Sequence, residues 1–220
     1  MGMLHLVRHG QASFGADDYD QLSELGTRQC RMLGEYWQAR GQRFDAVLTG
    51  TLKRHRQSFA AIAAGLGEAP DALELPGLNE YDSEALIRAI HPEPLAKPRN
   101  AEEVREHFRL LRRALSAWMR AETAPAGMPS FADFSSGIAQ ALDHVRERCE
   151  GQVLIVSSGG PISTAVAQVL GAPVETGIDL NMRIRNSAVT EFVFNPKRHS
   201  LHSFNVLPHL DAHPQLVSAT

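Results

Sequence analysis

Cysteine is scarce in this sequence, with only Cys30 and Cys149 among 220 residues. Both fall in stretches with a helical pattern, and neither has a partner at the spacing of a metal site. We therefore expect two small, buried or half-buried thiols in a protein of a reducing compartment, and no disulfide framework.

An excess of positive charge is also missing. The 22 lysines and arginines are outnumbered by 25 aspartates and glutamates, and the formal net charge of -3 gives no basic surface for nucleic acid or an anionic membrane. The first ten residues hold only a short apolar stretch before Arg8, too short for a signal peptide or a membrane span. Leu6 does not fit the myristoylation pattern. These absences predict a cytoplasmic protein with no nucleic-acid and no membrane partner.

The sequence does have enough apolar residues for one large α/β domain, since 43% hydrophobic and 21% charged residues are the proportions of an ordinary globular protein. Short apolar stretches typical of buried strands alternate with amphipathic stretches typical of helices. The predicted strands lie within residues 3–7, 44–50, 72–82 and 152–157. This alternation predicts a three-layer α/β fold with a mostly parallel central sheet and helices on both faces.

The region from about residue 83 to 150 breaks this alternation. Two amphipathic helices follow each other there without a strand between them, and we expect a helical insert over one end of the sheet. Residues 187–194 and 200–207 alternate polar and apolar side chains, which predicts a closing hairpin at one edge. We therefore expect a single domain over residues 1–207 and a polar, proline-broken, loosely ordered tail over 208–220.

Polar residues gather where the predicted parallel strands end, which is the edge at which such sheets hold their ligands. The candidate site residues there are Arg8, His9, Gln11, Arg54, Glu80, Ser158 and Gly159. Arginine suits phosphate because its planar fork can hold two phosphoryl oxygens and stays charged. A glycine turn at a helix N-terminus also favours an anion. The set predicts a phosphate site with a nucleophile, His9, and an acid, Glu80.

Each of these residues has an ordinary structural interpretation as well. A histidine at a strand end usually packs, an arginine on a helix usually faces solvent, and Glu80 is equally suited to a turn. Their convergence from separate strand ends favours the functional interpretation.

Five segments around these residues resemble motifs of the histidine phosphatase superfamily, also called phosphoglycerate mutase-like. They are LVRHGQAS, LSELGTRQC, TGTLKRHRQSFA, LNEYD and VLIVSSGGPIS. The resemblance implies the fold of that superfamily. It also implies that His9 attacks a phosphoryl group to form a phosphohistidine, which water then hydrolyses, while Glu80 protonates the leaving oxygen. The residues implied in substrate binding are Arg8, Gln11, Arg54, Ser158 and Gly159.

The last of these segments departs from the superfamily pattern, which usually reads Ser-His-Gly-Gly, because Ser158 stands in the position of the histidine. A hydroxyl is shorter and neutral but still donates one hydrogen bond, and the loss of one preorganised donor lowers rates by ~10²–10³ at comparable sites. We expect a weakened phosphatase in which Ser158→His raises turnover, because the glycine turn leaves room for a larger side chain. The alternative is a pocket rebuilt around Ser158 by a water or a neighbouring side chain, in which Ser158→His lowers activity.

A phosphatase fits the sequence better than a mutase, since mutases of the superfamily carry extra basic segments and residues 81–94 are acidic and proline-broken. The expected substrate is a small-molecule or protein phosphomonoester, no cofactor is implied, and free phosphate or sulfate should bind Arg8, His9 and Arg54. The alternative is a pseudo-phosphatase that holds a phosphorylated ligand through the two arginines, which Ser158 favours. A serine hydrolase is unsupported because the serine-elbow pattern is missing.

Other histidines and basic residues carry weaker signals. Two histidine pairs near the C-terminus lack carboxylates beside them, so we predict no metal site there. These pairs are His199 with His202 and His209 with His213. Four residues of the predicted insert are candidates for the mouth of the site, with solvated surface as the alternative. They are Arg88, His91, Lys97 and Arg99.

Overall fold

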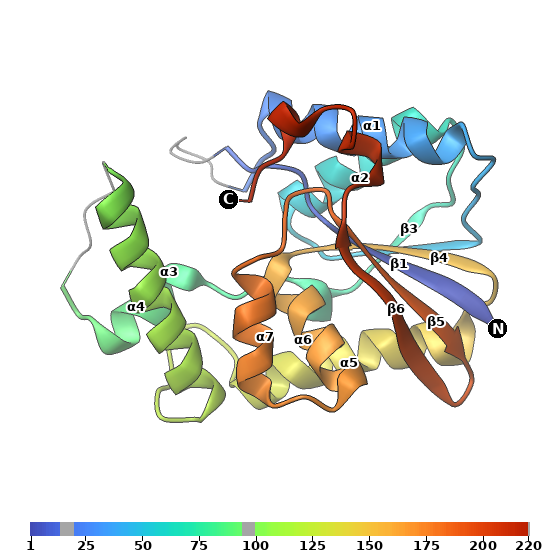
Figure 1. Cartoon of the computed structure of the whole chain (residues 1–220). Coiled ribbons are helices and arrows are strands. Elements are labelled where there is room, and N and C mark those ends of the chain that lie inside the picture. The colour runs from blue at the N-terminus through green and yellow to red at the C-terminus, as the bar shows by residue number, and fades with distance from the viewer. Residues whose placement is uncertain (14–19, 94–99, 220) are drawn as a thin grey trace.

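A six-stranded sheet forms the centre of the computed structural model, which describes residues 1–13, 20–93 and 100–219 (Figure 1). Its strands are β1 (Gly2–Arg8), β2 (Ala46–Thr49), β3 (Ala72–Glu74), β4 (Gln152–Ser157), β5 (Val189–Asn195) and β6 (Arg198–Val206). The order across the sheet is β3-β2-β4-β1-β5-β6. The first four of these strands are parallel, whereas β5 and β6 are antiparallel to their neighbours. The predicted mostly parallel sheet with a hairpin at one edge is confirmed.

Helices cover both faces of this sheet, as the sequence predicts for a three-layer α/β fold. They are α1 (Glu24–Gln38), α2 (Lys53–Leu66), α3 (Ser83–Ile90), α4 (Ala101–Met119), α5 (Phe131–Arg148), α6 (Gly159–Leu170) and α7 (Val174–Asn181). Helices α1 and α2 pack side by side on one face, and α5 and α6 lie together on the other (Figure 1). Among the described helices, none is long and apolar enough to cross a membrane.

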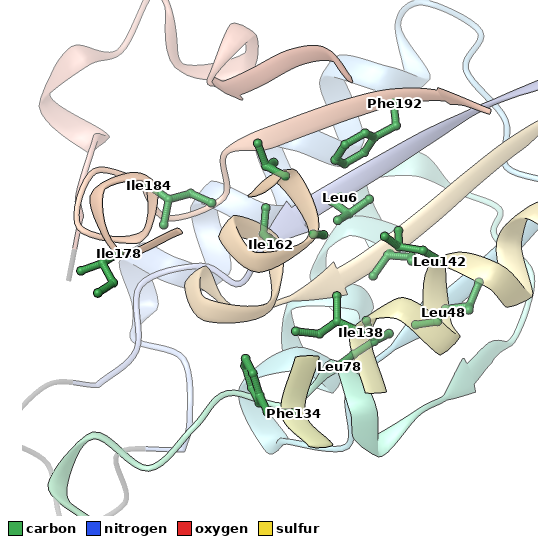
Figure 2. Close-up of a cluster of buried hydrophobic side chains, with 14 of the residues drawn as sticks. Leu6, Leu48, Leu78, Phe134, Ile138, Leu142, Ile162, Ile178, Ile184 and Phe192 are labelled. Atoms are coloured by element: carbon green, nitrogen blue, oxygen red, sulfur yellow. The ribbon is translucent and has the colours of Figure 1, made fainter. Parts of the chain in front are cut away.

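The middle strand β4 shows why both faces need a cover. Side chains of residues 153–156 alternate between the core cluster beneath α5 and α6 and the cluster beneath α1 and α2. Figure 2 shows the first cluster, in which Ile162 of α6 and Leu142 of α5 lie on either side of Leu6 from β1. Burial on both faces fixes the strand, and with it the position of every residue that follows the strand end.

The helices of the predicted insert have two different places in the fold. Helices α3 and α4 pack against each other, and α4 also contacts α7, beyond one end of the sheet (Figure 1). Helix α5 instead forms part of the layer on the sheet, because its Ile138 and Leu142 belong to the core cluster with β1 and β4. Among the described helices of the predicted insert, α3 and α4 thus lie beyond the end of the sheet, whereas α5 packs on its face.

The C-terminal segment 208–219 is ordered, contrary to the expectation of a loose tail. It forms two short 3₁₀ helices, Pro208–Leu210 and Pro214–Leu216, whose leucines are buried. The side chain of Gln29 donates a hydrogen bond of 2.7 Å to the carbonyl oxygen of Leu216. Prolines break long helices, but here they start short ones that cover a small apolar cluster.

Candidate active site

His9 directly follows β1 and sits at the carboxyl edge of the parallel strands. Its Nδ1 lies 2.7 Å from the carbonyl oxygen of Gly10. A carbonyl can only accept, so Nδ1 carries the hydrogen and Nε2 keeps its lone pair. The pKa of His9 is lowered well below its usual range, first by burial and then by the charges of Arg8 and Arg54. The ring is therefore neutral near pH 7 and presents an unprotonated Nε2.

The backbone of His9 is held by a loop that the sequence did not suggest. The carbonyl oxygen of His9 accepts hydrogen bonds from the backbone N–H of Ser187 (3.2 Å) and from the side chain of Asn186 (3.4 Å). The backbone N–H of Asn186 donates in turn to the carbonyl oxygen of Ser218, at 2.9 Å. The C-terminal segment thus supports the loop that fixes the histidine.

Arg8 and Arg54 bring two positive charges to the same place. Arg54 lies in the first turn of α2, and its Nη1 donates to Asp20 Oδ1 at 2.7 Å. The guanidinium of Arg8 donates to the backbone carbonyl of Ile184. Both charges act on His9 and on Glu80, whose pKa values they lower. The two arginines are therefore close to both the predicted nucleophile and the predicted acid.

Asp20 was missed at the level of sequence. Its carboxylate accepts a hydrogen bond of 2.9 Å from the backbone N–H of Lys53 and so caps α2 from a distant loop. Helix α2 needs such a cap because Leu52, at its N-cap position, offers no side-chain acceptor. The same carboxylate orients Arg54, so one side chain both starts the helix and aims its arginine.

Glu80 follows a 3₁₀ turn (Pro76–Leu78) and contacts the glycine turn after β4. One carboxylate oxygen accepts from the backbone N–H of Gly160 at 3.1 Å, and the other from that of Tyr81 at 3.2 Å. A Cβ on Gly160 would lie 2.1 Å from Glu80 Oε1, so only glycine permits this approach. Burial raises the pKa of Glu80, although the Gly160 hydrogen bond and both arginines act in the opposite direction. Glu80 therefore keeps its proton to higher pH than an ordinary glutamate.

Ser158 follows β4 and has a partner that the sequence does not indicate, His55. The Ser158 Oγ lies 2.6 Å from His55 Nε2, and neither residue has exposed surface. His55 comes directly after Arg54 on α2, and its ring centroid is 5.9 Å from that of His9. Because it stands among Lys53, Arg54 and Arg56, the sequence pattern indicates solvated surface rather than a buried ring.

The space expected beside Ser158 is not present. The ring of His55 fills it, and a Cβ on Gly50 would lie 2.2 Å from His55 Nδ1, so the ring is also confined from its other side. The expectation that the glycine turn leaves room for a larger side chain at residue 158 is therefore wrong. The alternative of a neighbouring side chain packed against the serine describes the structure.

Gln11 and Gly159 lie next to this group. The side-chain oxygen of Gln11 accepts from Ser23 Oγ at 3.0 Å, which ties it to the start of α1. Gly159 is buried at the first position of α6, directly after Ser158. The structure thus brings His9, Glu80, Arg8 and Arg54 close together. Ser158, Gly159 and Gln11 are next to them in the chain or across the glycine turn, but the side chain of Gln11 points to the start of α1.

The candidate residues at the mouth are less informative. Arg88 is exposed and pairs with Glu84 at 3.5 Å, and His91 Nδ1 lies 3.0 Å from the carbonyl oxygen of Glu93. Lys97 and Arg99 lie outside the described residues. Within the described residues, no three His, Cys, Asp or Glu side chains form a group that would hold a metal ion.

Comparisons with known proteins identify the family to which the chain belongs. A family model described as the histidine phosphatase superfamily (branch 1) matches residues 4–207. A curated 2,3-bisphosphoglycerate-dependent phosphoglycerate mutase from Methylorubrum populi is 30% identical over 87 residues, which cover 36% of this chain and 41% of the mutase. The match therefore spans less than half the length of that relative.

Solved structures resemble the whole chain at low sequence identity. The alpha-ribazole phosphatase from Shigella flexneri superposes with a TM-score of 0.65 at 21% identity, covering 93% of this chain and 96% of that one. The phosphoserine phosphatase from Entamoeba histolytica, in complex with 3-phosphoglyceric acid, gives 0.64 at 22% identity over 96% of this chain and all of the other. These likenesses show a shared fold.

Proposed function

Because the chain belongs to the histidine phosphatase superfamily, we propose that it hydrolyses phosphomonoesters through a phosphohistidine on His9. The observation that carries this proposal is the state of the His9 ring. Its Nδ1–H is held by the carbonyl oxygen of Gly10, and burial together with two guanidinium charges lowers its pKa. A neutral imidazole with a free Nε2 beside two positive charges is suited to attack a phosphoryl group.

In the first step, His9 Nε2 attacks phosphorus in line with the leaving oxygen. The N–P bond forms, the P–O bond to the leaving group breaks, and Glu80 transfers its proton to the departing oxygen. Arg8 and Arg54 balance the charge on the equatorial phosphoryl oxygens, which supplies most of the rate in phosphoryl transfer. Burial of Glu80 supports its role, because its raised pKa keeps the proton available.

In the second step, water attacks the phosphohistidine from the side that the leaving group has vacated. The Glu80 carboxylate takes a proton from this water, the N–P bond breaks, and phosphate leaves. The same carboxyl group therefore serves first as acid and then as base. Its hydrogen bonds from Gly160 and Tyr81 stabilise the charged form between the two steps.

The substrate class proposed here is a phosphomonoester, with hydrolysis as the main activity. The acidic segment after Glu80 supports hydrolysis over a mutase reaction, which needs a second charged site for the phosphoglycerate carboxylate. A phosphoglycerate mutase is the second candidate, because the curated relative bears that name.

The experiment is a hydrolysis screen with p-nitrophenyl phosphate, phosphoserine and 3-phosphoglycerate, in which the inorganic phosphate released is measured. We expect His9→Ala to abolish hydrolysis, and His202→Ala, at an exposed histidine of β6, to leave it unchanged. Hydrolysis that survives His9→Ala would contradict the proposal. No hydrolysis by the parent, together with phosphate binding that Arg8→Ala removes, would instead support the pseudo-phosphatase.

A further inference from the structure

The histidine at position 55 has no role in the scheme above, yet it touches the centre of the site. We propose that His55 is a positioning residue that holds the hydroxyl of Ser158 as a hydrogen-bond donor toward the phosphoryl oxygens. This inference rests on the proposed function, since it assigns a task within the same site. It starts from the 2.6 Å contact between His55 Nε2 and Ser158 Oγ.

The direction of this hydrogen bond follows from the second ring nitrogen. His55 Nδ1 is buried and has no hydrogen-bond partner among the described residues. A proton on Nδ1 would be an unmet donor in the interior, and orphaned N–H groups are rarer there than unmet acceptors. We therefore assign the proton to Nε2, which donates to Ser158 Oγ. The serine hydroxyl then directs its own hydrogen elsewhere.

The position of the serine indicates where that hydrogen is used. Ser158 stands at the N-cap position of α6, but its side chain makes no capping hydrogen bond. The rings of His55 and His9 are 5.9 Å apart. The backbone N–H of His9 also donates to the carbonyl oxygen of Ser157 at 2.8 Å, so Ser158 directly follows a residue that pairs with the nucleophile. A phosphoryl group attacked by His9 would bring oxygens to this hydroxyl.

The burial of the His55 ring indicates that it is present for its hydrogen bond to Ser158 and not for packing alone. His55 has no exposed surface, and Gly50 leaves out the Cβ that would collide with its Nδ1. An apolar side chain would fill the same space without the cost of placing an imidazole in the interior. The site thus contains a buried polar ring whose described hydrogen bond leads to one hydroxyl at the reaction centre.

Ser158 does not attack phosphorus itself in this account. A serine nucleophile needs a base, and burial together with the charge of Arg54 lowers the pKa of His55 to about 3. It also needs a third group to orient that base, whereas His55 Nδ1 has no such partner among the described residues. The pair is therefore suited to donate a hydrogen bond and poorly suited to accept a proton.

The test compares four variants with p-nitrophenyl phosphate, whose leaving group needs little help from Glu80. His55→Phe keeps an aromatic ring and removes the donor, His55→Gln retains an N–H near the position of Nε2, and Ser158→Ala removes the hydroxyl. We expect His55→Phe and Ser158→Ala each to lower kcat about 10-fold with little change in KM, as for one neutral hydrogen bond. We expect His55→Gln to keep most of the activity, and the double variant His55→Phe/Ser158→Ala to lose no more than either single one.

Vanadate affinity, measured by isothermal titration calorimetry, separates this inference from the proposed function. If the parent hydrolyses nothing but vanadate binds about 10-fold more weakly to His55→Phe than to His55→Gln, the donor pair stands and hydrolysis fails. If hydrolysis depends on His9 while His55→Phe retains full kcat, or the losses of the two single variants multiply, the positioning role fails and hydrolysis stands. An equal loss of kcat in His55→Gln and His55→Phe would also overturn the positioning role, because such a result would show that His55 contributes by packing alone.

Discussion

At the scale of single residues, the pKa values of His9 and Glu80 are shifted in opposite directions, and under the proposed mechanism these shifts determine how activity depends on pH. His9 must be neutral to attack, and its pKa is lowered well below its usual range by burial and the arginines. Glu80 must hold a proton to assist the leaving group, and its pKa is raised by burial. We therefore expect activity to be retained as the pH falls below 6.5 and to decline as the pH rises through the pKa of Glu80.

This pH dependence can be assigned to Glu80 with phenyl phosphate, a substrate whose leaving oxygen needs a proton. We expect Glu80→Gln to lower kcat by about 10²-fold at the acidic end, the usual contribution of a general acid. The ratio of parent to variant rates should fall as the pH rises, since the parent loses its acid there. A ratio that is constant across the pH range would show that Glu80 does not act as the acid.

A second prediction at this scale concerns Ser158 and His55, where an imidazole is introduced at one position and removed from the other. Ser158→His alone should lower kcat, because the ring of His55 occupies the adjoining space. The double variant His55→Ala/Ser158→His removes that ring, and we expect it to recover activity relative to Ser158→His. Steady-state kinetics with p-nitrophenyl phosphate checks both. Faster turnover in Ser158→His than in the parent would contradict the observed packing.

At the scale of elements, we expect the N-terminus of α2 to affect both stability and activity. Asp20 caps this helix and orients Arg54. We expect Asp20→Ala to cost ~1 kcal/mol in the free energy of unfolding, as for other lost caps, and to lower kcat severalfold because Arg54 loses its orientation. Urea denaturation and steady-state kinetics measure the two effects.

A matched control is the cap of α5, where Ser130 Oγ accepts from the backbone N–H of Asp133 at 3.1 Å. Ser130→Ala should cost a similar ~1 kcal/mol without a change in kcat, because α5 packs on the opposite face of the sheet from α2, the helix that carries Arg54. If Asp20→Ala changed stability and left kcat at the parent value, Asp20 would be a cap alone.

Sequence patterns predicted the secondary-structure elements better than they predicted the contacts of single side chains. Four parallel strands follow from short apolar runs, and in such a sheet the residues after each run must share one edge, which brings His9, Glu80 and Ser158 together. His55 could not be found in this way, because it lies on a helix between charged neighbours and its partner is 103 positions away. Local periodicity carries no information about a contact of that range.

At the scale of the whole molecule, the C-terminal segment 208–219 contacts two elements beside the end of β1. These are helix α1, through Gln29, and the loop at Asn186 that binds the His9 carbonyl. Leu216 packs in a small apolar cluster, and its carbonyl oxygen accepts from Gln29. The sequence predicted a loose tail because polar residues and prolines dominate it, whereas a few leucines are sufficient to anchor it.

This anchoring predicts a long-range effect on activity. We expect Leu216→Ala to cost ~2–3 kcal/mol in the free energy of unfolding, the lower part of the range for buried leucines. It should also lower kcat, because the loop that binds the His9 carbonyl rests on the segment. Val217→Ala, at an exposed neighbour, should stay within ~0.5 kcal/mol of the parent and keep full activity. Thermal unfolding and steady-state kinetics measure both effects. No difference between the two variants would contradict the claim that the C-terminal segment supports the loop at the His9 carbonyl.

The identity of the phosphorylated residue tests the central claim most directly. Rapid acid-free quenching during turnover of p-nitrophenyl phosphate, followed by mass spectrometry at neutral to alkaline pH, should place one phosphoryl group on His9. The adduct should be lost on brief acid treatment, as an N–P bond requires, and should be absent in His9→Ala. Label on Ser158 that survives acid, or full turnover in His9→Ala, would contradict the phosphohistidine mechanism.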